Sequence, residues 1–157
     1  MTARSYAALI LSTFALVDCA VYSKQQPVES DRAVALAYVK AWNTRDTAAI
    51  DTLLARNGVH EDIAQNFRGT GAKAVKEFLR GLGKASPDFK WNVTNSIEDG
   101  RYVALEWTWT ATYTGPDPGG RPVTNRRTSG RGASLAEVDD GKITRFTDYY
   151  DRPSFFR

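Results

Sequence analysis

The chain has 157 residues, enough for one domain of ordinary size and too few for two. Hydrophobic residues make up 42% and charged residues 25%, a composition that excludes disorder along the whole length. The net charge is only +3 and the basic residues are scattered, so we expect no nucleic-acid partner. A single cysteine and a single histidine exclude an internal disulfide framework, a cysteine-based zinc site and a multi-histidine metal site, and we expect no metal.

An apolar run near the N-terminus predicts an export signal. The run covers residues 6–17, follows Arg4, and is too short to cross a bilayer comfortably. Small residues before Ser23 favour cleavage there, which gives a signal peptide over 1–23, a polar linker over 24–30 and a domain over 31–157. We therefore expect an exported protein, secreted or periplasmic, with no stable membrane insertion after cleavage.

Two other interpretations of the N-terminus stay open. The segment that ends at Cys19 is similar to a lipoprotein signal, which would anchor the protein by a lipid, although Asp18 departs from that pattern. Alternatively, the run is an N-terminal helix that stays on the protein.

Three helices are predicted after the linker. The first begins at Ser30 or Asp31 and has an apolar face that includes Trp42. The second follows a break at residues 43–46 and ends at residues 57–58. A short strand over 59–63 and a turn over 68–71 come next, and the third helix ends at Gly83.

The remaining sequence alternates between apolar and polar residues, as β-strands do. Strands are expected over residues 89–97, 101–114, 121–138 and 142–150, with a bulge at Gly130 or Gly132 in the third of them. Helices followed by an antiparallel meander indicate an α+β fold. We expect a cone-shaped α+β barrel, in which three N-terminal helices pack on a strongly curved, mainly antiparallel sheet and the concave side forms a cavity.

The alternation also predicts which side chains enter the cavity. One face of the strand over 101–114 carries Trp107 and Trp109, and one face of the last strand carries Thr144, Phe146, Asp148 and Tyr150. If these faces point inward, Asp148 lies among aromatic rings, an environment that disfavours a charged carboxyl group and suits a general acid or base. The alternative is that Asp148 is exposed at the strand end and Asp151 points inward.

His60 and Asp62 lie two residues apart on a predicted strand and therefore share a face. Both are candidates for the same pocket, because polar residues on an inner strand need partners. The alternatives are a structural or surface role for His60, and a core role for Trp107 and Trp109.

Five segments together resemble the SnoaL-like polyketide cyclases. They cover residues 42–46, 59–62, 68–72, 122–127 and 140–151. This family belongs to the nuclear transport factor 2-like superfamily, with ketosteroid isomerase, scytalone dehydratase and limonene epoxide hydrolase. The resemblance spans residues 31–156 and implies the cone-shaped fold, a scaffold that carries many chemistries and also non-enzymes.

The resemblance also implies roles for single residues. The acid/base aspartate of the polyketide cyclases matches Asp148. Their pocket histidine falls at Ser134, so this chain lacks one residue that their aldol-type cyclisation uses. The arginine and aspartate of the epoxide hydrolases fall at Trp107 and Trp109, so the hydrolase charge relay is missing. Their tyrosine and asparagine that hold water fall near His60 and Asp62.

Two functional hypotheses follow. The first is an isomerase, cyclase or lyase without a cofactor, acting on a flat, hydrophobic carbonyl compound. Asp148 would remove a proton, His60 would orient Asp148 or donate to the enolate oxygen, and Asp62 would complete the polar set. The residues expected to contact the substrate are Trp42, Trp107, Trp109, Ser134, Phe146 and Tyr150.

The second hypothesis is a module of the same fold that binds a small molecule, or dimerises, without turnover. In either case we expect a homodimer through the convex face of the sheet. The residues expected on that face are Glu106, Thr108, Thr110, Ala133 and Arg145.

Overall fold

The computed structural model describes residues 30–115, 123 and 125–151. The predicted signal peptide, Cys19 and residues 24–29 of the linker lie outside the described residues. Within the described residues, no helix is both long and apolar enough to cross a membrane.

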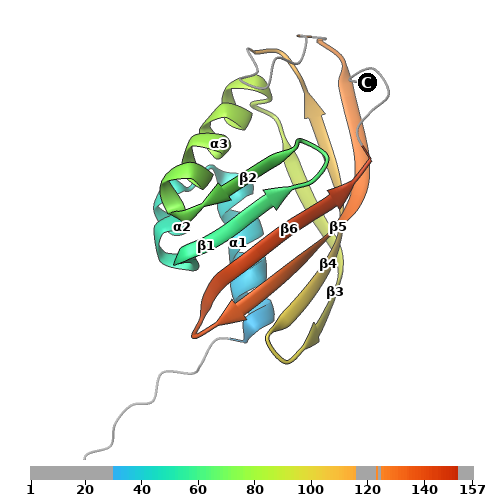
Figure 1. The fold of residues 1–157 in the computed structure, drawn as a ribbon. Helices are drawn as coiled ribbons and strands as arrows, with labels where there is room; N and C mark the ends of the chain where they lie inside the picture. Colours follow the sequence, from blue (N-terminus) through green and yellow to red (C-terminus); the bar gives the residue numbers. More distant parts are fainter. Residues whose placement is uncertain (1–29, 116–122, 124, 152–157) are drawn as a thin grey trace, which may run out of the picture.

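Three helices pack on one face of a curved six-stranded sheet, as Figure 1 shows. The elements in chain order are α1 (Asp31–Thr44), α2 (Thr47–Leu53), β1 (Leu54–Asp62), β2 (Phe67–Thr70), α3 (Gly71–Ala85), β3 (Lys90–Asp99), β4 (Tyr102–Thr112), β5 (Arg127–Asp139) and β6 (Lys142–Tyr150). The strand order is β2-β1-β6-β5-β4-β3, and β1–β6 is its parallel pair. The predicted α+β fold is therefore confirmed, with a sheet that is curled but not closed.

The corner between α1 and α2 fixes how the first helix lies on the sheet. Ser30 caps α1 by accepting a hydrogen bond from the backbone N–H of Ala33. Arg45 ends α1 in the left-handed region with φ of 59°, and its guanidinium donates to the carbonyl of Trp42 at 2.6 Å. Asp46 then caps α2 through its carboxylate. Trp42 is held at this corner with its ring toward the sheet, where it is buried.

The second helix is shorter than predicted. It ends at Leu53, and Asn57 and Gly58 lie inside β1, where the pairing of β1 with β6 is irregular. A Cβ on Gly58 would come within 2.6 Å of the Ile143 carbonyl oxygen, so the glycine allows the strands to approach. The predicted turn at 68–71 was also wrong, because Phe67–Thr70 forms β2 and pairs with β1.

The predicted bulge at Gly130 or Gly132 is absent from the described pairing of β4 with β5, which runs without a break. Both glycines instead lie opposite tryptophans, at the pairs Trp109–Gly130 and Trp107–Gly132. The irregularity lies further along β5, between residues 137 and 138, against β6. It reverses the alternation there, so that Ile143 is fully buried and Thr144 is not.

Candidate functional site

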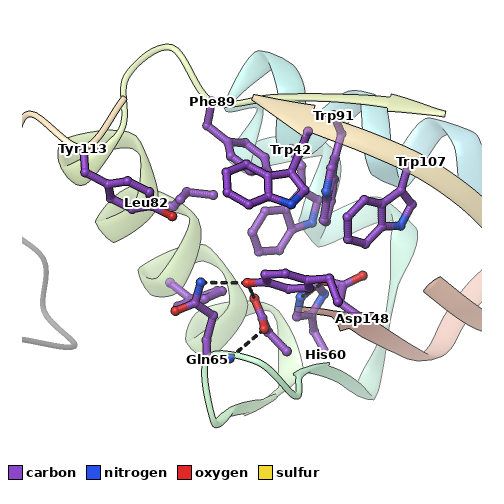
Figure 2. Close-up of a pocket in the computed structure, with 13 residues that line it drawn as sticks. Trp42, His60, Gln65, Leu82, Phe89, Trp91, Trp107, Tyr113 and Asp148 are labelled. Carbon is purple, nitrogen blue, oxygen red and sulfur yellow. Dashed lines mark hydrogen bonds and ion pairs between the residues drawn. The ribbon is translucent and has the colours of Figure 1, made fainter. Parts of the chain in front are cut away.

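A cavity opens between the helices and the concave face of the sheet (Figure 2). Its empty volume, mouth included, is about 540 Å³. The lining residues are mostly aromatic: Trp42, His60, Asp62, Gln65, Phe78, Leu82, Phe89, Trp91, Trp107, Trp109, Tyr113, Asp148 and Tyr150. All three predicted polar residues thus reach one cavity, together with four of the six residues expected to contact a substrate.

The other two predicted contact residues lie behind the lining. Ser134 is 2% exposed and lies beneath Asp148, and Phe146 is fully buried beneath His60. Their side chains can therefore support the lining residues, but neither is among those that line the cavity.

Asp148 comes from the C-terminal part of β6 and accepts a buried chain of hydrogen bonds. The hydroxyl of Ser134 donates to Asp148 Oδ1 at 2.5 Å, and the indole N–H of Trp107 donates to the same hydroxyl at 2.7 Å. β5 and β6 place Ser134 directly opposite Asp148 in the antiparallel ladder, so both side chains point to the concave face. Asp148 is only 1% exposed, so its carboxyl oxygens are shielded from solvent. The hydrogen bond from Ser134 supplies the partner that buried Oδ1 needs.

His60 comes from β1 and lies between two aromatic rings. Its ring stacks on Trp42, with centroids 4.6 Å apart, and on Phe146 at 5.5 Å. Nδ1 lies 3.1 Å from the hydroxyl of Tyr38, a buried residue of α1. Nε2 lies 3.3 Å from Asp148 Oδ2 and has no aligned hydrogen-bond partner within the described part of the chain. This placement directs the imidazole at the Asp148 carboxyl group.

Asp62 lies beside Asp148, because the parallel ladder pairs these two residues directly. Asp62 Oδ2 accepts a hydrogen bond from the hydroxyl of Tyr150 at 3.0 Å, and that hydroxyl accepts one from the Gln65 side chain at 2.7 Å. The backbone N–H of Gln65 donates to Asp62 Oδ1 at 2.9 Å. Figure 2 shows these contacts at the cavity wall opposite the tryptophans.

The environment of Asp62 changes its acidity. Burial, followed by the neighbouring charge of Asp148, raises the pKa of Asp62 to about 7, from an ordinary 3.8. Burial likewise raises the pKa of Tyr38 and of Tyr150 far above the ordinary value of a phenol. Near neutral pH, Asp62 can therefore both hold and release a proton, while the two phenols stay protonated.

Several pocket residues were not among those predicted. Trp91 alternates with Phe89 in the predicted strand over 89–97, and that period-two signal could have placed it beside the other tryptophans. Gln65 lies in the connection between β1 and β2, and its position depends on Tyr150, which is 85 residues away. No local signal identifies such a residue.

Within the described residues, no group of three or more His, Cys, Asp or Glu side chains is placed to hold a metal ion. The polar groups of the cavity bind one another, through Ser134, Tyr38 and Tyr150. The arrangement is suited to proton transfer by the side chains themselves.

The curved sheet buries a carboxyl pair and an imidazole in its concave face. This arrangement is typical of α+β folds that hold a small-molecule pocket. The chain belongs to the SnoaL-like polyketide cyclase family, whose profile matches residues 32–157. No curated protein sequence matches it.

Solved structures share the fold. AclR from Streptomyces galilaeus, provisionally described as a hydroxylase, is 26% identical with a TM-score of 0.63, and the match covers 77% of this chain and 78% of AclR. A protein of ketosteroid isomerase-like fold from Catenulispora acidiphila, in complex with trimethylamine, is 21% identical with a TM-score of 0.67, covering 78% and 88%. TerC, co-crystallised with polyporic acid, is 18% identical with a TM-score of 0.65, covering 77% and 91%.

Proposed function

We propose that this protein is an acid/base enzyme that removes a proton next to the carbonyl group of a small hydrophobic compound, without a cofactor. Isomerisation, cyclisation and elimination all begin with this step. The observation that carries the proposal is the burial of His60, Asp62 and Asp148 together in an aromatic cavity. Membership of the SnoaL-like family, and small organic molecules bound by proteins of this fold, support it.

The two aspartates take different roles in this proposal. Asp148 is the base, because Ser134 donates to one of its oxygens and His60 faces the other. Asp62 is the acid, because its pKa of about 7 lets it carry a proton to the carbonyl oxygen. His60 is a positioning residue, since Tyr38 and Asp148 face its two nitrogens.

Hydrogen–deuterium exchange tests the proposal without knowledge of the product. A panel of small ketones is incubated with the protein in D₂O, and loss of the proton signal next to the carbonyl group is followed by NMR. We expect exchange by the wild type and a loss of at least about 100-fold in Asp148→Asn. Asp140→Asn is the matched control, because Asp140 is exposed in a turn at a φ of 48° that asparagine also adopts. Equal exchange by the wild type and Asp148→Asn would contradict the proposal.

We also propose that two copies associate through the convex face of the sheet. Leu135 and Tyr149 are exposed there at 40% and 48%, beside Glu106, Thr108 and Ala133. Large apolar side chains on an open sheet face favour association. Light scattering after gel filtration should give twice the chain mass, and Leu135→Glu should return it to one chain. A monomeric wild type at micromolar concentration would reject the dimer.

A further inference from the structure

The cavity is a cage of aromatic rings with carboxyl groups at one wall. All four tryptophans of the chain line it: Trp42, Trp91, Trp107 and Trp109. Three of these rings follow one another, with centroids 5.6 Å apart for Trp42–Trp91 and 5.5 Å apart for Trp91–Trp107. Phe89 lies between Trp91 and the fourth, Trp109, at 5.5 and 6.4 Å. Figure 2 shows Trp42, Trp91 and Trp107 together, with Gln65 across the cavity from them. His60 stacks on Trp42 at 4.6 Å and directs Nε2 at Asp148. Tryptophan attracts cations more strongly than other rings, because the face of the indole is electron-rich.

The charge of the cavity also favours a cation. Asp62 and Asp148 are 7% and 1% exposed, and both line the cavity. No Lys or Arg side chain is among the described lining residues, although the chain as a whole has a net charge of +3. When these carboxyl groups are ionised, they attract a cationic ligand and repel an anionic one.

The rings around the cavity favour a compact group. Trp91 lies 5.5 Å from Trp107 and 5.5 Å from Phe89 between ring centroids, and all three line the cavity. Rings on several sides of one space suit a compact, branched group that presents apolar surface in every direction. A nitrogen atom that carries several methyl groups has this shape, an apolar surface for the rings and a positive charge for the carboxylates.

We infer that the cavity recognises a methylated ammonium group, so that the carbonyl compound of the proposed function is a small cation whose hydrophobic surface is that of its N-methyl groups. This deepens the proposed function, on which it rests, by naming the class of the substrate. The methyl groups contact the tryptophans, and the positive charge lies toward Asp62 and Asp148. A trialkylammonium group next to a carbonyl-bearing chain would also acidify the proton that Asp148 removes.

Choline and its neutral analogue dimethylbutanol, in which carbon replaces nitrogen, give a direct test. The two molecules have the same shape, so a difference in affinity reports the charge alone. Because every tryptophan of the chain lines the cavity, tryptophan fluorescence reports binding there, and calorimetry gives the dissociation constants. We expect choline and tetramethylammonium to bind, and choline to bind at least about tenfold more tightly than dimethylbutanol. Equal affinities, or no binding of either cation, would overturn the inference.

Two variants sharpen the test. At about pH 9, above the pKa of about 7 of the Asp62 carboxyl group, Asp62→Asn should weaken choline at least about fivefold, because it removes a negative charge, and should change dimethylbutanol by less than about twofold. Asp140→Asn should bind both probes as the wild type does. An equal effect of Asp62→Asn on both probes would overturn the inference. Choline binding without any exchange of ketone protons would reject the proposed function alone and still support the ligand class.

Discussion

The hydrogen-bond chain beneath Asp148 can be tested by the substitution Ser134→Ala. The Ser134 hydroxyl donates to Asp148 Oδ1 and accepts from the indole N–H of Trp107, and all three residues are at most 2% exposed. Removing the hydroxyl deletes a hydrogen bond to a charged group, worth about 1.5–3 kcal/mol, and leaves a buried indole N–H unpaired, at about 1–3 kcal/mol. The free energy of unfolding should therefore fall by about 2.5–6 kcal/mol, a large part of the stability of a domain this size.

Urea unfolding at neutral pH, followed by circular dichroism and by tryptophan fluorescence, measures this change. Ser129→Ala is the matched control, because Ser129 lies on the same strand and is exposed. The control should stay within about 0.5 kcal/mol of the wild type. If Ser134→Ala loses no more stability than Ser129→Ala, then the hydroxyl does not hold the Asp148 carboxylate and the geometry of the proposed base is wrong.

Three further predictions follow from single features. Folded Asp62 holds its proton to about pH 7, whereas an unfolded aspartate loses it near pH ~4, so the folded state binds more protons in between. The free energy of unfolding should fall as the pH rises through that window, and Asp62→Asn should remove this fall. Urea unfolding at both ends of the window measures the change, and an equal fall in the wild type and the variant would contradict the prediction. In Gly132→Ala, the new Cβ would lie 2.6 Å from the Tyr149 carbonyl oxygen, so the melting temperature should drop by an amount equivalent to about 1–3 kcal/mol, and an unchanged melting temperature would show that the strand can move. His60→Phe keeps an aromatic ring between Trp42 and Phe146 but removes the nitrogen that faces Asp148. Ketone exchange should therefore fall, while choline affinity changes by less than about threefold. Full activity would exclude a positioning role for His60.

The last strand shows how much of the site the sequence could predict. Period-two alternation places Phe146, Asp148 and Tyr150 on one face, and all three point to the concave side as expected. The alternation failed at Thr144, because a local irregularity against β5 reverses the faces there. Alternation is a local rule, and it holds only while the pairing of the strand is regular.

The start of β1 could not be predicted for a different reason. Leu53 and Leu54 continue the apolar stripe of α2, and Asn57-Gly58 has the composition of a helix end. What makes this segment a strand is its pairing with β6, almost 90 residues further along the chain. The contacts of Asp62 with Gln65 and Tyr150 depend on the same pairing. The sequence could therefore predict that Asp62 and Tyr150 lie in the pocket, but not that they are hydrogen-bonded to each other.

β6 is the last of the described strands along the chain, and yet it lies inside the sheet, with β1 on one side and β5 on the other. Until it is inserted, the β1–β2 hairpin and the β3–β4–β5 meander have no described pairing that joins them. During synthesis, the segment that ends at Tyr150 emerges after the other five described strands, so neither half can complete the common core until β6 has been made. A protein shortened by even this one strand would lose Asp148, the ladder that aligns Asp62 with it, and the continuity of the sheet in a single step.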